Sequence, residues 1–275
     1  MLNSGPIGIF DSGYGGLTVL KEIRKQLPQY EYIYLGDSAR TPYGNRSYQT
    51  VYQYTLQAVK FLFNNGCHLV ILACNTASAK ALRTIQQNDL NQIDASRRVL
   101  GVIRPSVEAV GKITKSRHIG VLGTKGTVNS QSFPMEINKL FPDIKVFQHA
   151  CPLWVPIVEN NEGESEGAAF FIKKDLQMLL AQSDKIDTII LGCTHYPLLM
   201  NVINKYTPSG ISIVPQNNIV AESLSDYLIR HPEMEKKCKK EKKCRYYTTD
   251  DAETFGNAGQ IFMNEKINAV HTSIG

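Results

Sequence analysis

The sequence is short of cysteine and has no long apolar segment. Its 275 residues include six cysteines, too few for a disulfide scaffold in a chain of this length. No stretch approaches the ~20 apolar residues that a membrane span requires, and the N-terminus lacks a charged region followed by a long apolar one. We therefore expect a cytoplasmic protein without a membrane partner, in which each cysteine is core filler, ligand or nucleophile.

Charge is also sparse outside one short segment. The chain carries 30 Lys and Arg against 25 Asp and Glu, a net charge of +5. Residues 235–245 alone account for that excess, so the rest of the chain is neutral. A nucleic-acid binder would spread basic residues over a face, and we therefore expect no nucleic-acid partner. The run KKCKKEKKCR is predicted to be a solvated helix end or loop, with Cys238 and Cys244 at the surface.

Short β-branched runs recur along the chain and alternate with segments of helical spacing. We predict strands at residues 6–10, 32–35, 69–73, 99–103, 118–122, 144–147, 188–191 and 211–214. Helical spacing is clear in Leu17, Leu20, Ile23 and Leu27, and again at residues 168–180. This alternation predicts an α/β fold with mainly parallel sheets covered by helices on both faces. The 43% hydrophobic content suits one large or two modest domains.

Two segments of the first half are echoed in the second. The run IGIFDSG at residues 7–13 resembles IGVLGTK at residues 119–125, about 112 positions later. Likewise VILACNT at residues 70–76 resembles IILGCTH at residues 189–195, about 119 positions later. Any two buried parallel strands look alike, but a cysteine in the same place after each is a less common match. We therefore predict a duplicated unit that forms two similar domains related by an approximate two-fold axis, with the active site between them.

Reactive side chains follow four of these strands. In an open α/β sheet, ligands bind at the carboxyl ends of the strands, where Asp11, Cys74, Thr124 and Cys193 fall. A thiol at a helix N-terminus feels the helix dipole, so both cysteines are predicted to have lowered pKa values and to act as bases or nucleophiles. Neighbouring hydroxyl and amide groups are suited to holding carboxylates: Ser12, Asn75, Thr76, Thr127 and Thr194. Usual zinc-ligand spacing is lacking, so no metal is expected.

Two equivalent thiols suit a reaction that inverts a carbon centre without a cofactor. One base removes a proton from one face of the carbon, while a second group delivers a proton to the other face. A duplicated scaffold that closes over a small substrate supplies one cysteine from each domain, Cys74 and Cys193. Reversal of the reaction only exchanges their roles. The pattern therefore predicts a racemase.

Six motifs in one order carry a resemblance to a known family. They are FDSGYGGLTVL, GDSARTPYG, LACNTAS, GTKGTV, CPLWVPIVE and LGCTHYPLL, and together they resemble the glutamate racemases of the aspartate/glutamate racemase family over nearly the whole chain. Residues 245–249 and Phe255 are similar to the family's closing strand and helix. The resemblance implies a racemase that uses no cofactor, acts on glutamate and supplies D-glutamate for peptidoglycan synthesis.

The resemblance also implies roles for individual residues. Cys74 and Cys193 are the catalytic pair, with Asp11 supporting Cys74, and with Glu159 and His195 supporting Cys193. The residues implied in substrate binding are Asp11, Ser12, Tyr43, Gly44, Asn75, Thr76, Thr124, Thr127, Thr194 and His195.

The expected domain division follows from the echoes and the resemblance. Residues 1–98 together with 207–275 are expected to form the first domain, to which the last strands return. Residues 99–206 are expected to form the second domain, which carries Cys193 and His195. We also expect a homodimer.

Two places depart from the commoner family pattern. Arg104 stands where an acidic residue is frequent, and Pro215-Gln216 replaces an Asp-containing turn. Neither touches the expected bases, so they bear on substrate preference, interface contacts and regulation. A cysteine after an apolar strand is more often a buried small hydrophobe, and we keep this interpretation for Cys67 and Cys151.

Three other functions remain open. An aspartate or hydantoin racemase would use the same two thiols with different side-chain contacts. A cysteine hydrolase would use one thiolate with His195 as base, which leaves the second cysteine unexplained. A binding or regulatory protein would hold an anion in the α/β clamp, and reports that some racemases of this family bind DNA gyrase extend this alternative to a second role.

Overall fold

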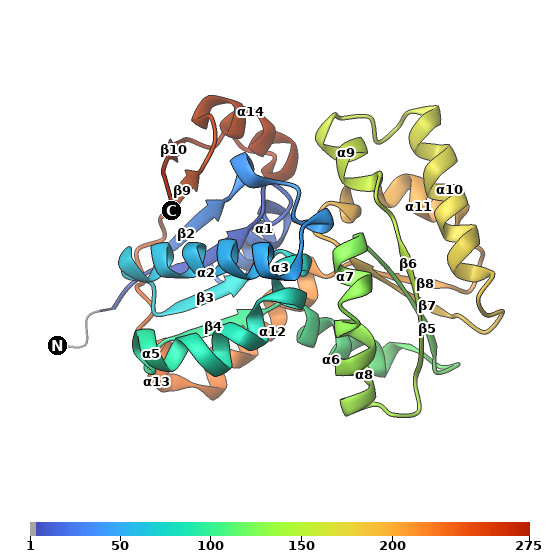
Figure 1. Ribbon diagram of the computed structural model, residues 1–275, viewed down its shortest axis with the longest axis horizontal. Helices are drawn as coiled ribbons and strands as arrows, with labels where there is room; N and C mark the ends of the chain where they lie inside the picture. Colours follow the sequence, from blue (N-terminus) through green and yellow to red (C-terminus); the bar gives the residue numbers. More distant parts are fainter. Residues whose placement is uncertain (1–3) are drawn as a thin grey trace.

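The computed structural model describes residues 4–275, which form two sheets side by side with helices against their faces (Figure 1). Each neighbouring pair of strands within these residues runs parallel. The fold is therefore α/β with parallel sheets, as the alternation of strand and helix patterns predicts. None of the helices in residues 4–275 is both long and apolar enough to cross a membrane.

The first sheet has six strands among the described residues, in the order β10-β9-β2-β1-β3-β4. Its strands are β1 Ile7–Asp11, β2 Tyr32–Gly36, β3 Leu69–Leu72, β4 Arg98–Gly101, β9 Cys244–Thr248 and β10 Ala269–His271. The helical segments on and around it are α1 Leu17–Gln26, η1 Ser38–Arg40, η2 Tyr43–Asn45, α2 Tyr48–Asn64, α3 Asn75–Lys80, α4 Leu82–Thr84, η3 Ile85–Asp89, α5 Leu90–Asp94, α12 Asn217–Arg230, α13 Pro232–Glu235 and α14 Ala252–Met263.

The second sheet has four strands within residues 4–275, in the order β6-β5-β7-β8. Its strands are β5 His118–Gly123, β6 Lys145–Ala150, β7 Thr188–Gly192 and β8 Ser212–Val214. Its helical segments are α6 Ile103–Ile113, α7 Lys125–Asn129, α8 Ser132–Leu140, α9 Trp154–Glu159, α10 Glu166–Leu180, η4 Tyr196–Leu199 and α11 Met200–Tyr206.

The two sheets share one strand order, which supports an internal duplication. In the first sheet β2-β1-β3-β4 are neighbours, and in the second β6-β5-β7-β8 occupy the same sequence of positions. The two echoed segments correspond to β1 with β5 and to β3 with β7. These strands form adjacent pairs in their sheets, so each half places one echoed pair at its centre.

The places where the chain passes between the sheets differ from the expected boundaries at residues 98 and 207. β4 pairs with β3 in the first sheet, whereas β8 pairs with β7 in the second. Both strands are short apolar runs, and no feature of their sequence indicates which strand they pair with. Only the tertiary structure therefore shows to which sheet each belongs. β9 and β10 do return to the first sheet through β2, as expected. Residues 1–3 of the expected first domain lie outside the described residues.

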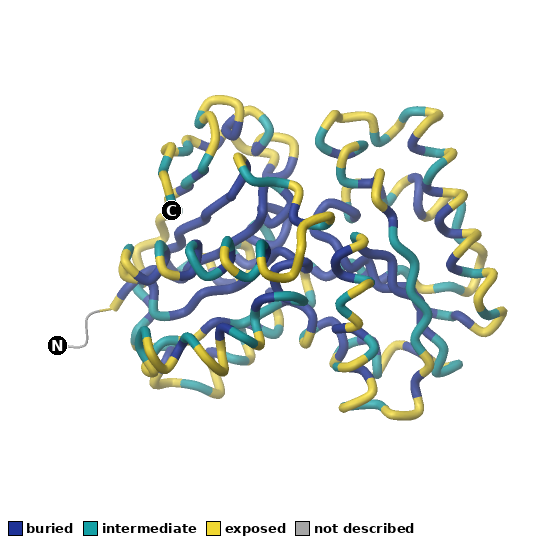
Figure 2. Tube along the Cα trace, in the orientation of Figure 1, coloured by how far each residue is buried: buried dark blue, intermediate teal, exposed yellow. Residues whose placement is uncertain are grey.

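Alternate side chains of the central strands enter different core clusters. On β1, Ile9 packs with α1 on one face of the sheet, and Phe10 packs with α2 on the other. The cluster that contains Ile9 continues into the second half, where it includes Leu179 of α10 and Leu191 of β7. Figure 2 shows buried strands at the centre of each sheet, the edge strand β6 with intermediate burial, and helices with exposed residues on their outer sides. A continuous apolar core therefore joins the two halves.

The basic segment is more ordered than expected from its composition. Glu31 is buried, and Arg245 and Lys239 form ion pairs with it at 3.2 and 3.4 Å. Cys238 is 5% exposed and Cys244 is partly buried, so the prediction of surface cysteines is wrong. The apolar side chains between the lysines fold inward because residues flanking this segment pair with the first sheet.

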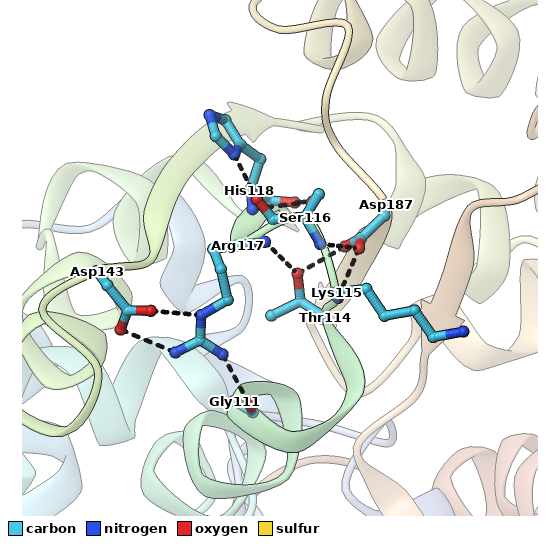
Figure 3. Close-up of polar contacts among 8 residues, drawn as sticks. All are labelled: Gly111, Thr114, Lys115, Ser116, Arg117, His118, Asp143 and Asp187. Carbon is cyan, nitrogen blue, oxygen red and sulfur yellow. Dashed lines mark hydrogen bonds and ion pairs between the residues drawn. The ribbon is translucent and has the colours of Figure 1, made fainter.

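A carboxylate fixes the turn that leads into the second sheet (Figure 3). Asp187 accepts hydrogen bonds from Thr114 Oγ1 at 2.7 Å, Lys115 N at 2.7 Å and Ser116 N at 2.6 Å. Burial alone would raise the pKa of Asp187, but the hydrogen bonds from Ser116 and Thr114 outweigh burial and hold the pKa well below its usual range. The charged form therefore stabilises the fold above the unfolded pKa of about 3.9, and this stabilisation is lost as the pH falls towards the lower folded value.

Replacing this carboxylate is expected to destabilise the protein. Asp187→Asn presents an amide NH₂ to backbone N–H donors, and we expect it to lower the free energy of unfolding by about 2 kcal/mol at pH 7. Urea denaturation measures this, and the difference from wild type should narrow below a pH of about 4. Asp143→Asn is the control, because Asp143 is mostly exposed in its ion pair with Arg117. Equal destabilisation by both substitutions would contradict the assignment.

Candidate active site

A cavity lies between the two halves, at the carboxyl ends of β1, β3, β5 and β7. Helices α3 and α7, which follow β3 and β5, approach each other across it (Figure 1). The cavity has a volume of about 80 Å³, which is below the roughly 300–1,000 Å³ of typical ligand pockets and restricts it to a very small molecule. The expected site residues that line it are Ser12, Tyr43, Gly44, Cys74, Asn75, Thr76, Thr124, Cys193, Thr194 and His195.

Three expected site residues do not line this cavity. Thr127 and Glu159 lie behind residues that line the cavity. Thr127 contacts Thr124, and Glu159 contacts His195. Asp11 ends β1, and its carboxyl is fully buried. The structure therefore brings the expected residues together in two layers around the cavity.

Cys74 is the N-cap residue of helix α3 and lies two residues after the end of β3. Its Sγ accepts a hydrogen bond from Ala77 N and lies 3.4 Å from Ser12 Oγ. Burial, together with the nearby Asp11 carboxyl, raises the pKa of Cys74 to about 12. The prediction that the helix terminus lowers this pKa is therefore wrong, because α3 is a short helix whose N–H groups do not offset the loss of water. Without a bound ligand, Cys74 holds its proton.

Cys193 has a different environment, although it occupies the equivalent place after β7. Its Sγ lies 3.9 Å from His195 Nδ1, and His195 Nε2 lies 3.0 Å from Glu159 Oε1. Burial alone would lower the pKa of His195, but its contacts with Cys193 and Glu159 raise the pKa to about 10. His195 is therefore protonated at neutral pH and places a positive charge beside the Cys193 sulfur. This charge favours negative charge that develops on the sulfur during proton transfer.

The Asp11 carboxyl is only partly satisfied. Its Oδ2 accepts a hydrogen bond from Gly13 N at 3.0 Å, while Oδ1 has no hydrogen-bond partner among the described residues. Burial raises the pKa of Asp11, and the positive charge of His195 opposes this effect. Within residues 4–275 no hydrogen bond joins Asp11 to Cys74, and Asp11 acts on Cys74 through charge. A buried carboxyl of this kind is suited to exchanging or accepting a proton near the site.

Three hydroxyl groups connect the halves at the floor of the site. Thr76 Oγ1 lies 2.9 Å from Thr124 Oγ1 and 3.4 Å from Thr127 Oγ1, and the last two lie 3.1 Å apart. Thr76 belongs to α3 and the other two belong to the start of α7. Hydroxyls both donate and accept, so this cluster is able to donate to a ligand carboxylate.

Close backbone approach shapes two sides of the site. A Cβ at Gly15 would overlap Thr194 and His195, so the loop after β1 lies directly against the second half. A Cβ at Gly44 would lie 2.9 Å from Thr124 Cβ. Glycine at these positions lets the two halves meet around the cavity.

Tyr43 contributes its ring to the cavity rather than its hydroxyl. The hydroxyl donates to Asp37 Oδ2, which also pairs with Arg40 Nε at 2.8 Å. Burial and the Asp37 carboxylate hold the pKa of Tyr43 far above its usual range. Tyr43 therefore stays neutral and forms an apolar wall.

The structure adds residues that sequence reasoning did not place at the site. Cys151 is buried, as predicted, but it also lines the cavity, as do Thr41 and Lys125. Gln216 hydrogen-bonds Asn75. Gln216 follows the apolar run of β8, and a position after a strand is the sequence signal for a site residue. The expected domain boundaries placed β8 in the first domain and so separated it from the strands of the second sheet. Arg104 lies on α6 in an exposed ion pair with Glu108 and does not line the cavity.

One cluster of metal-ligand types lies beside the site. His149, Cys151 and Asp175 have potential ligand atoms within 4.8 Å of one another. Both Asp175 oxygens are already engaged, one by His149 Nε2 at 3.0 Å and the other by Trp154 Nε1 at 2.8 Å. This network joins α10 to the first residue of α9, whose last residue is Glu159. Its geometry is that of a hydrogen-bond network that holds α9 in place.

Comparisons with known proteins agree with this geometry. The family model of Asp/Glu/Hydantoin racemases matches residues 7–224. A glutamate racemase from Geobacter metallireducens is 38% identical over 96% of this chain and 95% of its own length. Among solved structures, a glutamate racemase from Bacillus anthracis has a TM-score of 0.89 at 34% identity, covering 99% of this chain and 98% of that one. One from Francisella tularensis in complex with D-glutamate has a TM-score of 0.87 at 31% identity, covering 99% of each chain. The chain therefore belongs to the Asp/Glu/Hydantoin racemase family.

Proposed function

We propose that the protein is a glutamate racemase that interconverts L- and D-glutamate by proton transfer at Cα. The observation that carries the proposal is the placement of Cys74 and Cys193 after equivalent strands of the two halves, lining one small cavity. Relatives at 38% identity over nearly the whole chain bear the name glutamate racemase, which favours glutamate over aspartate or hydantoin. The alternative of a cysteine hydrolase leaves the second thiol without a role.

The proposed reaction moves one proton at each face of Cα. One thiolate takes the Cα proton, the electron pair of that C–H bond is held by the adjacent carboxylate, and the opposite thiol donates its proton to the other face of the carbon. The free enzyme is suited to this reaction, since Cys74 is protonated and the imidazolium of His195 lies beside the Cys193 sulfur. After one turnover the two cysteines have exchanged protonation states, and a proton shift through His195 or Asp11 restores them.

Other site residues hold the substrate in this proposal. The hydroxyl cluster of Thr76, Thr124 and Thr127 donates to a carboxylate. Ser12, Gly44 and Thr194 form further walls of the cavity. Glu159 holds the imidazolium of His195. No cofactor has a part in this chemistry.

The proposal is tested by incubating the pure protein with L-glutamate alone. We expect D-glutamate to form until the enantiomers are equal, with solvent deuterium incorporated at Cα when the reaction is run in D₂O. L-Aspartate is the control substrate and should be converted much more slowly. An absolute requirement for pyridoxal phosphate, inhibition by chelators that added metal reverses, or faster turnover of aspartate would overturn the proposal.

Three further statements belong to the same proposal. D-Glutamate made in this way supplies peptidoglycan synthesis, and the protein acts in the cytoplasm as a homodimer. Relatives that bear the name glutamate racemase support the formation of D-glutamate in the first statement. Light scattering coupled to size-exclusion chromatography measures the assembly state directly.

A further inference from the structure

A buried glutamine from the second half contacts the residue that follows Cys74. Gln216 comes after β8 and is 3% exposed. Its Oε1 lies 2.6 Å from Asn75 Nδ2, and its Nε2 lies 2.7 Å from Ser106 Oγ on α6. Asn75 is the first residue of α3 and lines the cavity. Gln216 therefore links the second half to the start of a site helix in the first.

The hydrogen bonds from Ser106 through Gln216 to Asn75 form a series, and the bond at the Ser106 end fixes the direction of the others. Ser106 Oγ donates to the carbonyl oxygen of Val102 at 2.9 Å, because a carbonyl can only accept. With its hydrogen used there, Ser106 Oγ accepts from the amide of Gln216, which must place Nε2 on that side. The oxygen of Gln216 then faces Asn75, which must donate with Nδ2. The orientation of the Asn75 amide follows from this chain.

The fixed orientation leaves the Asn75 oxygen free. Asn75 is 2% exposed, and its Oδ1 has no hydrogen-bond partner among residues 4–275. A buried acceptor without a partner costs roughly 1–3 kcal/mol unless a ligand supplies a donor. The sequence suggests that this amide donates to a carboxylate, but one of the two Nδ2 hydrogens is used on Gln216, and the group left without a partner is the oxygen, which can only accept. A carboxylate offers only acceptors, whereas an ammonium group offers three donors.

We propose that Gln216 is a positioning residue that holds Asn75 so that its Oδ1 accepts a hydrogen bond from the amino group of the substrate. The inference rests on the proposed function and specifies which part of glutamate this side of the site recognises. Gln216 acts through Asn75 and does not itself line the cavity. If the amide of Asn75 were free to turn, it would present donor and acceptor in either direction and would select the amino group less strongly.

The test compares ligands with and without an amino group. Gln216→Met keeps an unbranched side chain of similar length and removes both hydrogen bonds. We expect KM for L- and D-glutamate to rise about tenfold, with a smaller change in kcat, since one charge-assisted hydrogen bond is weakened. The inhibition constant of glutarate, which has both carboxylates but no amino group, should change little. An equal rise for glutamate and glutarate would overturn the proposal.

A double-substitution cycle tests the route through Asn75 independently. Asn75→Ala removes the acceptor, so adding Gln216→Met to it should cause no further loss of glutamate affinity. If the losses of glutamate affinity in the two single variants multiplied in the double variant, Gln216 would act by another route and the proposal would be overturned. Gln86→Met is the matched control, because Gln86 Nε2 donates to Val99 O at 2.8 Å away from the cavity, and thermal melting compares the folding of the variants. Absence of racemisation in wild type would instead refute the proposed function.

Discussion

Cys74→Ser and Cys193→Ser are each expected to lower racemisation by roughly 10²- to 10⁴-fold. Serine is a far weaker acid than cysteine, and it neither ionises nor returns a proton at the rate that a thiol does. Both thiols line the same cavity from different halves, so loss of either removes proton transfer at one face of Cα. The measurement is the rate of D-glutamate formation from L-glutamate, and of the reverse reaction.

The two variants are expected to differ in a half-reaction. Because the enantiomers have equal free energy, kcat/KM must fall equally in both directions, and racemisation rates alone do not assign a cysteine to a face. A glutamate analogue with a leaving group at the adjacent carbon undergoes elimination after proton abstraction alone. Cys74→Ser should then retain elimination with one enantiomer of that analogue, and Cys193→Ser with the other.

The control for this experiment is a cysteine outside the cavity. Cys244 is partly buried on β9 and lies in the first sheet away from the site, so Cys244→Ser should racemise glutamate at nearly the wild-type rate. The same enantiomer preference in both active-site variants would refute the assignment of one thiol to each face. Full activity in either variant would remove that cysteine from the mechanism.

His195→Gln is expected to have the next largest effect, a loss of racemisation of about 10²-fold. The substitution removes the positive charge that lies beside the Cys193 sulfur and breaks the contact with Glu159. The substitution should slow the proton transfers in which Cys193 takes part. Elimination should therefore slow for the enantiomer that Cys193 deprotonates and persist for the other. Glu159→Gln should show the same side preference with a smaller loss, because the imidazole remains.

The pH dependence provides a second measurement of the role of His195. Its pKa is raised to about 10, so the imidazolium is present at neutral pH and is lost as the pH rises through that value. In wild type, the elimination rate of the enantiomer that Cys193 deprotonates should then decline as the pH rises through about 10. This decline should exceed any decline for the enantiomer that Cys74 deprotonates. The His195→Gln variant should lack this additional decline. An identical high-pH profile on both sides in wild type would show that His195 does not serve Cys193 in particular.

The sequence by itself determined eight of the ten strands in residues 4–275, the duplication, and the placement of Cys74 and Cys193 after equivalent strands. The central strands are continuous apolar runs, so their period and their flanking helices are local properties. Cys74 and Cys193 follow such runs directly, and parallel strands place their carboxyl ends at one edge of a sheet. Reasoning from residues that are near one another in the chain was sufficient for these features. The strand β10 was missed because its three residues are partly buried or exposed and form no apolar run, unlike the predicted run that contains β8.

Tertiary structure alone decided the features that depend on distant residues. It assigned β4 and β8 to their sheets, and it buried Cys74 beside Asp11, which raised a pKa that the helix terminus was expected to lower. It also brought Gln216 against Asn75. Burial, charge and hydrogen-bond direction depend on which atoms meet in space, and residues that are more than a hundred positions apart in the chain supply those atoms here.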